Sequence, residues 1–272
     1  MKDSVSYTAL IMAAKRAIES TRPDRLFDDP FAAQLAGEEV DILIQQWASM
    51  GKELEFAKIA YTRYVAVRTR FFDEFVLSAS AEAQQLVILG AGMDTRAFRL
   101  PWATEMQIYE VDRPEIMTYK ESILKDAPLS CQRQSIALDL TDDWVDALCC
   151  QGYQCDRPSI WLLEGLLMYL PEATVHPLLQ TIAALTTPGS RLGVDLISVR
   201  SLECALRSQG RVRRHWQFAT NEPEQLLAQY GWAATVVEPG DPTADFGRCP
   251  DPPLPRHIPG KRRSFLATAR KR

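Results

Sequence analysis

Histidine and cysteine, the usual ligands of structural metals, are few in this sequence and poorly spaced for that purpose. The three histidines, His176, His215 and His257, stand far apart, and the six cysteines form no Cys-x-x-Cys motif. These spacings give no zinc signature, and a chain without an export signal does not favour a disulfide framework. We therefore expect no metal site, and we expect the cysteines to be buried or half-buried free thiols.

A strong charge imbalance and a long apolar run are also missing. The formal net charge is -4 over 272 residues, which gives no electrostatic reason to expect a nucleic acid or an anionic membrane as partner. No apolar run approaches the roughly 18 residues that cross a bilayer. The stretch 9–14 is too short for a signal-peptide core, and Lys15 and Arg16 follow it in place of a cleavage site. We expect a cytoplasmic protein, either a monomer or a homodimer.

The sequence pattern changes near residue 85. Residues 8–79 are rich in Ala and Leu, and apolar residues at three-to-four spacing predict one long helix over 54–77. From residue 85 onward, short apolar segments alternate with helical patterns, which predicts an α/β fold with a parallel sheet covered on both faces. The predicted strands are LVILG (86–90), IYEVD (108–112), SIALDL (135–140), IWLLEG (160–165), RLGVDLI (191–197), ATVVEPG (234–240) and SFLATAR (264–270).

Two segments depart from this alternation. Residues 240–260 form a loop rich in Pro and Gly, so we expect the last strand to enter by a short return and to run antiparallel. Residues 198–221 lie between the fifth strand and the next helix, where a substrate lid is expected. The expected organisation is a single domain over 1–272, with an N-terminal helical cap (1–82), a core (83–197), the lid (198–221) and the C-terminal part of the core (222–272).

The first predicted strand ends in the turn Gly90-Ala91-Gly92, at the sheet edge where open α/β folds bind ligands. A dinucleotide fold would continue to a third glycine, but Thr95 occupies that position and Asp94 precedes it. A carboxylate is unfavourable beside a diphosphate and favourable beside an ammonium group or ribose hydroxyls. The turn predicts a nucleotide cofactor, and Asp94, Thr95 and Arg96 either contact that cofactor or anchor the turn.

Carboxylates also end the next three predicted strands. Asp112 ends the second strand, Asp139 closes the third and Glu164 closes the fourth. Asp112 suits the two hydroxyls of a ribose, which NAD and S-adenosylmethionine share. Together with the Gly turn, these acids predict a ligand with hydroxyls, an amine and positive charge, which favours S-adenosylmethionine over a dinucleotide.

The chain resembles the leucine carboxyl methyltransferase family, and more closely its bacterial branch, which methylates polyketides and other small molecules. The resemblance is strong over residues 8–197 and weak over 217–270. It is carried by ALIMAAKRAIESTRPDRLFDDPFAA, YVAVRTRFFDEFV, QLVILGAGMDTRAFRLPW, YEVDRPEIMTYK, LDLTDDWVDAL and SIWLLEGLLMYLPEATV. It implies the Rossmann-like fold of class I S-adenosylmethionine-dependent methyltransferases: a seven-stranded, mostly parallel sheet with an N-terminal helical extension and a lid insertion.

The resemblance also implies roles for residues of the core. Gly90 and Gly92 would contact the methionine part of the cofactor through the backbone. Asp112 would hold the ribose, and Asp139 and the Leu140 amide would face the adenine.

Four further residues receive roles in the same way. Glu164 would meet the ammonium group of the cofactor, and Arg68 would clamp its carboxylate. Lys15 or Arg16, in the N-terminal helix, would close over the cofactor. Tyr64 lies one helical turn before Arg68 and either touches the site or packs in the core.

The methyl acceptor is expected to be a small molecule, and two acceptor groups stay open. A carboxylate, with an ordinary pKa of about 4, needs no general base, whereas a hydroxyl would benefit from one. The candidates for catalysis are His215, Arg214 and Tyr169, with His257 as a further possible base. The lid also carries several arginines, which suit an acidic acceptor: Arg207, Arg211, Arg213 and Arg214.

The predicted function is therefore an S-adenosylmethionine-dependent O-methyltransferase acting on a secondary metabolite. Three alternatives stay open: an NAD-dependent oxidoreductase, a carboxyl methyltransferase acting on a protein or peptide, and a noncatalytic binding protein that kept the fold. Thr95, in place of the third glycine, disfavours the oxidoreductase, and the intact set of rim acids disfavours the noncatalytic protein.

Overall fold

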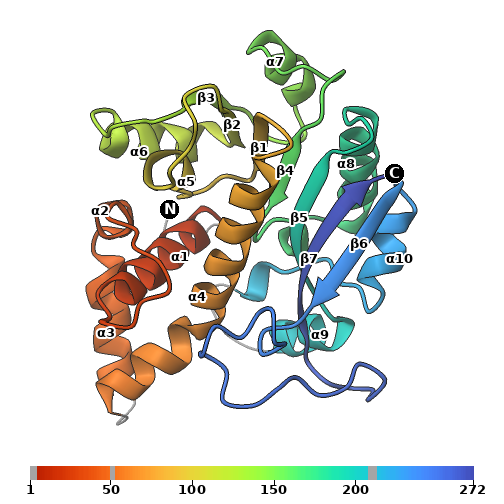
Figure 1. The fold of residues 1–272 in the computed structure, drawn as a ribbon. Helices are drawn as coiled ribbons and strands as arrows, with labels where there is room; N and C mark the ends of the chain where they lie inside the picture. Colours follow the sequence, from red (N-terminus) through yellow and green to blue (C-terminus); the bar gives the residue numbers. More distant parts are fainter. Residues whose placement is uncertain (1–4, 50–52, 208–212) are drawn as a thin grey trace.

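Seven strands form one sheet in the order β3-β2-β1-β4-β5-β7-β6 (Figure 1). The structure is a computed structural model that describes residues 5–49, 53–207 and 213–272. The strands are β1 Gln85–Leu89, β2 Gln107–Asp112, β3 Gln132–Ala137, β4 Ile160–Leu163, β5 Arg191–Ile197, β6 Trp232–Val237 and β7 Ser264–Lys271. Strands β1 to β5 pair in parallel, and β7 runs antiparallel to both β5 and β6. This confirms the predicted mostly parallel sheet and its antiparallel last strand.

The continuously apolar β1 is buried on both faces of the sheet, as its sequence predicts. Val87 and Leu89 belong to one apolar cluster, and Leu86 and Ile88 belong to another on the opposite face. Successive side chains of a strand point to opposite faces, so one five-residue run supplies both cores.

The third strand ends earlier than predicted. It spans Gln132–Ala137, not 135–140, so Asp139 lies beyond the strand and does not close it. The Asp139 carboxylate accepts hydrogen bonds from the Thr141 backbone N–H at 2.9 Å and from its hydroxyl at 2.8 Å. Such a local turn competes with strand pairing, which is why the strand stops before it.

Helices cover both faces of the sheet. The long helix α4 (Leu54–Ala79) and the short α5 (Arg96–Arg99) pack on one face, and α7 (Trp144–Cys150), α8 (Glu172–Ala184) and α10 (Pro223–Ala228) pack on the other. The predicted helix over 54–77 is confirmed as α4. A short 3-10 turn, η1 (Leu167–Tyr169), follows β4.

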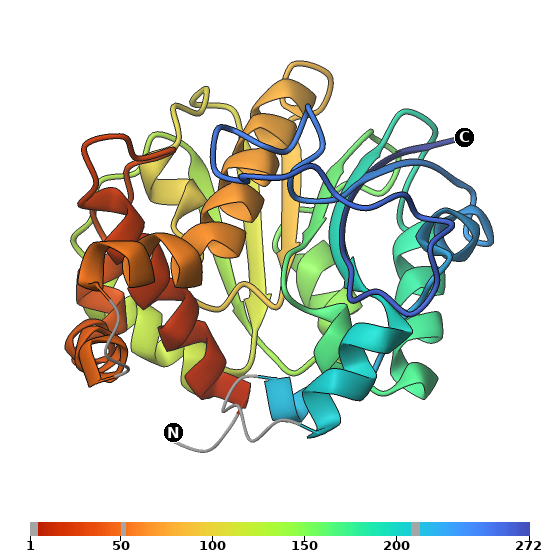
Figure 2. The same ribbon diagram turned by 90° about the horizontal axis from the view of Figure 1, so that it is seen from below.

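The N-terminal helices form a third packing unit beside the sheet. Helices α1 (Val5–Ser20), α2 (Ala32–Ala36) and α3 (Glu39–Ser49) share an apolar cluster with α6 (Pro114–Leu124). Figure 2 looks onto the carboxyl ends of the parallel strands and shows α1 on this side of the molecule. This placement brings α1 to the rim where the predicted cofactor residues lie.

The predicted lid segment also crosses this end of the molecule (Figure 2). It contains α9 (Val199–Arg207) and the short 3-10 helix η2 (Arg213–His215). The backbone N–H of Gln217 donates to the Met168 carbonyl at 2.7 Å, which ties the segment to η1. Of the predicted lid arginines, Arg211 lies outside the described residues.

The expectation that all cysteines are buried or half-buried is wrong for three of them. Cys149, Cys150 and Cys155 are exposed. Helix α7 turns Trp144 and Leu148 into the core, so the two cysteines at its end face solvent. Across the described residues, no helix has the length and apolarity that crossing a membrane requires.

Candidate functional site

A cavity of about 290 Å³ lies at the carboxyl ends of the parallel strands, between the Gly turn after β1 and helix α1. Most of the predicted site residues line it: Arg16, Arg68, Gly90, Gly92, Asp94, Asp112, Asp139, Leu140, Glu164 and Tyr169. Lys15, Arg214 and His215 do not line it. The structure therefore brings together at one rim residues from α1, α4 and the ends of four strands.

The two glycines of the turn lie where an added side chain would press against its neighbours. Gly90 and Gly92 both have positive φ, at 65° and 46°. A Cβ at Gly90 would lie 2.8 Å from Cδ1 of Leu166, and one at Gly92 would lie 3.3 Å from Cβ of Ala9. The turn thus needs glycine at both positions, and it leaves the backbone open to the cavity.

Asp112 holds the Gly turn from the next strand. Its carboxylate accepts hydrogen bonds from the Gly92 N–H at 2.6 Å and from the Arg113 N–H at 2.7 Å. Burial raises the pKa of Asp112 above its ordinary value, and these two amide hydrogen bonds oppose the rise. Each carboxylate oxygen keeps a further lone pair, so Asp112 can still accept from the hydroxyls of a ribose in the cavity.

Asp94 anchors the turn, as one of the two sequence interpretations expected. Its carboxylate accepts the Arg96 backbone N–H at 2.7 Å and forms an ion pair with the Arg96 guanidinium. Burial alone would raise the pKa of Asp94, but the Arg96 charge, the charges of Lys120 and Arg99 and the Arg96 N–H hydrogen bond together outweigh burial and lower it to about 2. Because Asp94 also lines the cavity, a contact with a cationic cofactor is compatible with this anchoring.

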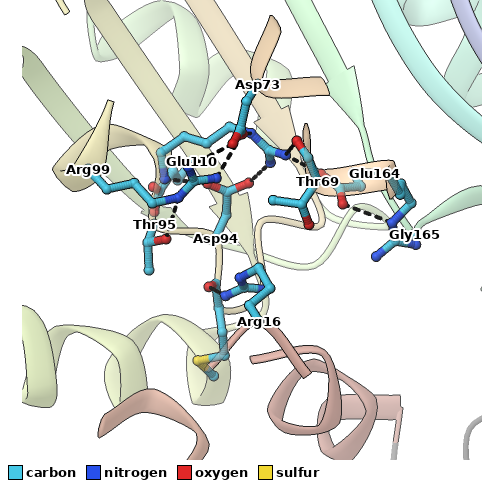
Figure 3. Close-up of polar contacts among 12 residues, drawn as sticks. Arg16, Thr69, Asp73, Asp94, Thr95, Arg99, Glu110, Glu164 and Gly165 are labelled. Carbon is cyan, nitrogen blue, oxygen red and sulfur yellow. Dashed lines mark hydrogen bonds and ion pairs between the residues drawn. The ribbon is translucent and has the colours of Figure 1, made fainter. Parts of the chain in front are cut away.

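Arg96, which the sequence offered only as an anchor of the turn, also holds other acids of the site. Its buried guanidinium contacts Asp94, Asp73 at 2.8 Å and Glu164 at 2.7 Å. Figure 3 shows Asp73, Asp94 and Glu164, from three separate elements, converging on one region. The signal available in the sequence was the arginine directly after Asp94-Thr95, at the start of α5.

Arg68 reaches the cavity already paired with carboxylates. Its Nε lies 2.8 Å from Glu164 Oε1, and its Nη1 lies 2.9 Å from Asp195 Oδ2. Burial would raise the pKa of Glu164, but Arg96 and then Arg68 outweigh it, so the pKa lies below its ordinary value. That Arg68 clamps a cofactor carboxylate stays a prediction; in this arrangement it orients Glu164.

Asp195, inside the apolar strand β5, is a residue that sequence reasoning missed. It is fully buried and binds Arg68, the Gly165 N–H at 2.5 Å and the Tyr64 hydroxyl at 2.9 Å. Burial, and then the Asp195 charge, raises the pKa of Tyr64 well above its ordinary value. Tyr64 therefore stays protonated and donates to Asp195. The signal in the sequence was a carboxylate within a continuously apolar strand.

Helix α1 closes the cavity through Arg16. The Arg16 Nε lies 2.8 Å from Asp29 Oδ2, and its Nη2 donates to the Met93 carbonyl of the turn. The Thr95 hydroxyl donates to the same Asp29 oxygen at 2.8 Å. In Figure 3, Arg16 approaches the turn from the side opposite Asp73. Of the two predicted cations of α1, Arg16 is thus the one that lines the cavity.

Lys15 faces a different neighbourhood from Arg16. Burial, the Arg213 charge of η2 and the Arg68 charge of α4 lower the pKa of Lys15 to about 8, in that order of importance. Within the described part of the chain, the Lys15 amine has no hydrogen bond or ion pair with a protein group. The charges of Arg213, from the lid, and Arg68, from α4, thus act on Lys15, and we call these three residues the cation group; Arg68 is the member already paired with carboxylates.

Of the candidates for catalysis, only Tyr169 lies at the cavity among the described residues. Tyr169 lines it, and burial raises the pKa of Tyr169 above its ordinary value. The exposed Arg214 donates from Nε to Nε2 of His215 at 3.1 Å, and neither residue reaches the cavity. His257 lies in a separate surface groove formed with the loop before β7, and Arg207 is exposed at the end of α9.

This arrangement can hold a nucleoside attached to an amino acid. The glycine cradle, the Asp112 carboxylate and the Asp139-Leu140 turn suit a nucleoside, and the buried Glu164 suits an ammonium group. In the described ranges, no three His, Cys, Asp or Glu side chains are grouped so as to hold a metal ion.

Two solved structures share this fold. A methyltransferase-like protein from Thermobifida fusca has a TM-score of 0.55 at 18% identity, covering 97% of this chain and 94% of its own. A DUF574 family protein from Streptomyces avermitilis has a TM-score of 0.54 at 14% identity, covering 96% and 97%. The fold is that of the class I S-adenosylmethionine-dependent methyltransferases.

The family follows from the sequence comparisons. Residues 9–183 match the model of the leucine carboxyl methyltransferase family, so the chain belongs to that family. A relative from Saccharopolyspora erythraea is 36% identical over 256 residues, 90% of this chain and 88% of its own. One from Mycobacteroides abscessus is 42% identical over 200 residues, 71% of this chain and 63% of its own. Both carry inferred assignments as S-adenosyl-L-methionine-dependent methyltransferases. The protein is an S-adenosylmethionine-dependent methyltransferase.

Proposed function

We propose that the protein is an O-methyltransferase whose acceptor is a small molecule, and that the acceptor oxygen belongs to a carboxylate. The observation that carries this proposal is the cation group, and above all Lys15, whose amine has no anionic partner among the described residues. Like charges held together in a partly buried site repel one another, so an anion that binds between them gains affinity.

The position of Lys15 supports the proposal that this anion belongs to the acceptor and not to the cofactor. Neighbouring residues of a helix point about 100° apart, because the helix has 3.6 residues per turn. Arg16 faces the cofactor cavity, whereas Lys15 lies near Arg213 of the lid. The carboxylate of the cofactor and that of the acceptor would therefore meet different cations of α1.

Bound S-adenosylmethionine supplies a methyl group on a sulfonium, from which an acceptor oxygen takes it by in-line displacement. An acceptor carboxylate is already ionised at neutral pH, so the protein needs no general base. Tyr169 and Tyr64 both have raised pKa values and stay protonated, so they serve as donors. The chain's own contribution is to orient the acceptor with the cation group and to exclude water with apolar side chains such as Met12 and Leu166.

The acceptor class can be tested with methyl-labelled S-adenosylmethionine. The panel contains aromatic and aliphatic carboxylic acids, each with the matching alcohol and primary amide, and peptides with a free C-terminus. We expect label on the small acids, released by mild base as expected for a methyl ester. Base-stable label on the alcohols, or label confined to the peptides, would overturn the proposal. A thermal shift with NADH and none with S-adenosylmethionine would favour an oxidoreductase.

The role of Lys15 can be tested with Lys15→Met. We expect kcat/KM for an acidic acceptor to fall about tenfold or more, because a charge-assisted contact is lost. The Kd for S-adenosylmethionine, measured by calorimetry, should change by less than about twofold. Lys125→Met is the matched control, since the Lys125 side chain is 72% exposed and far from the cation group in sequence. A weakened cofactor Kd with unchanged acceptor KM would instead place Lys15 at the cofactor carboxylate.

A further inference from the structure

Arg96 joins three acids that come from three different parts of the fold. Asp73 lies on α4, Asp94 lies in the Gly turn, and Glu164 follows β4. Arg96 is 2% exposed, and its Nε, Nη1 and Nη2 atoms each contact one of these carboxylates. Its Nη2 also lies 3.5 Å from the Thr69 carbonyl. The planar guanidinium, with its five N–H donors, matches such a divergent set of acceptors in a way that an ammonium group cannot.

The three acids differ in what else they touch. Asp73 is also held by the Arg99 guanidinium, with both contacts at 2.7 Å. Asp94 also accepts the backbone N–H of Arg96. Glu164 depends on Arg96 and Arg68 for its ion pairs, and it is the one that the family resemblance directs toward the ammonium group of the cofactor. Loss of Arg96 therefore removes one of the two cations that hold Glu164.

We propose that Arg96 is a positioning residue that keeps the Glu164 carboxylate ionised and aimed into the cavity for the ammonium group of the cofactor. This inference rests on the assignment of Glu164 to the cofactor. Arg96 fixes Glu164 on Oε2 while Arg68 fixes it on Oε1, so the carboxylate plane is held from both sides. One lone pair on each oxygen stays available for a third donor.

The electrostatic surroundings of Glu164 explain why Arg96 matters. The charged groups facing it are Arg96 from α5, Arg68 from α4, Arg16 from α1 and Asp94 from the turn. Burial and Asp94 favour the protonated acid, while the arginines favour the carboxylate. Without Arg96, burial and the Asp94 charge are opposed by Arg68 and by the more distant Arg16. Protonation of Glu164 then competes with cofactor binding at a higher pH than in wild type.

The test compares the Kd for S-adenosylmethionine at about pH 6 and pH 8 in the full-length protein. For Arg96→Met, we expect the Kd relative to wild type to be about tenfold weaker at pH 6 than at pH 8, because one unit of pKa corresponds to a factor of ten. Lys15 and the amine of the cofactor also titrate in this range. They do so in both proteins, so their effect cancels when the variant Kd is divided by the wild-type Kd at the same pH. Arg96→Lys keeps the positive charge, so we expect its Kd for S-adenosylmethionine to stay within about threefold of the wild-type Kd at both pH values.

Arg133→Met is the matched control for the loss of a buried arginine. Arg133 pairs with Glu110 and Glu121 at 2.7 Å each and does not line the cavity. We expect this variant to lose thermal stability, as Arg96→Met does, while its cofactor Kd keeps the wild-type dependence on pH. If the Kd of Arg96→Met relative to wild type is the same at pH 6 and pH 8, the proposal is wrong.

Glu164→Gln separates failure of this inference from failure of the site assignment. If Glu164→Gln binds the cofactor as tightly as wild type, Glu164 does not face the ammonium group and the premise is wrong. If Glu164→Gln binds weakly while Arg96→Met behaves as wild type at both pH values, the premise holds and the role of Arg96 is wrong.

Discussion

Two groups of buried ion pairs among the described residues differ in whether they reach the cavity. The rim network comprises Arg68, Asp73, Asp94, Arg96, Glu164 and Asp195. The β2–β3 cluster comprises Glu110, Lys120, Glu121 and Arg133. In both groups, buried arginine or lysine side chains form ion pairs with carboxylates. Four residues of the rim network line the cavity, namely Arg68, Asp94, Arg96 and Glu164, whereas no residue of the β2–β3 cluster does.

This difference separates charges that serve a ligand from charges that join elements. Glu110 and Lys120 are both fully buried, 2.6 Å apart, between β2 and α6. Breaking such a pair is costly because it leaves an uncompensated charge in the interior, even though the intact pair adds little. In the rim network, by contrast, Glu164 keeps access to the cavity through an 11% exposed side chain. Burial of a charged group therefore does not identify a functional residue unless a cavity reaches it.

The largest expected effect on stability comes from the β2–β3 cluster. Lys120→Met removes the cation closest to Glu110 and leaves Arg133 as its remaining partner, so we expect a loss of about 3 kcal/mol in the free energy of unfolding, at the lower end for a broken buried pair. The cofactor Kd of the folded fraction should stay within about twofold of wild type. Denaturant unfolding and calorimetry check the two parts. If Lys120→Met instead changes the cofactor Kd strongly and loses little stability, the β2–β3 cluster serves the ligand as the rim network does, and the comparison fails.

A smaller effect, and one that depends on pH, is expected from the rim network. The folded-state pKa of Asp94, about 2, lies below the ordinary value near 4. Its ion pair thus contributes stability above about pH 4, and this contribution is lost as the pH falls toward 2. We expect Asp94→Asn to be less stable than wild type by about 2 kcal/mol at pH 6, with the gap narrowing below pH 4. Unfolding curves at several pH values check this, and a gap that is constant across them would contradict it.

Much of the fold could be predicted because its signals are local. The apolar run of β1 and the periodicity of α4 each specify an element without reference to the rest of the chain. Parallel strands place their carboxyl ends at one edge, so Asp112 and Glu164 could be assigned to a common rim before any contact was known. The third strand was placed three residues too far along because the Asp139 turn resembles a continuing strand in sequence.

The contacts of the site could not be predicted in the same way, because they join residues that are far apart in sequence. Asp29 meets Thr95, and Arg68 meets Asp195, only after the helices have packed. The choice between Lys15 and Arg16 depends on the rotation of α1 about its axis. An apolar cluster that includes Ala13, Ala14 and Ile18 fixes this rotation. Sequence periodicity gives the face of a helix that is buried but not which partner each polar neighbour meets.

The central claim is that the rim cavity holds S-adenosylmethionine through the carboxylate at the end of β2. Calorimetric titration of S-adenosylmethionine into wild type, Asp112→Ala and Glu110→Gln tests it most directly. Asp112 and Glu110 lie two positions apart on the same strand, but they belong to the rim and to the β2–β3 cluster respectively. We predict about 100-fold weaker binding for Asp112→Ala, since charge-assisted hydrogen bonds to both ribose hydroxyls are lost, and a Kd near wild type for Glu110→Gln. Equal affinity of Asp112→Ala and wild type would contradict the account.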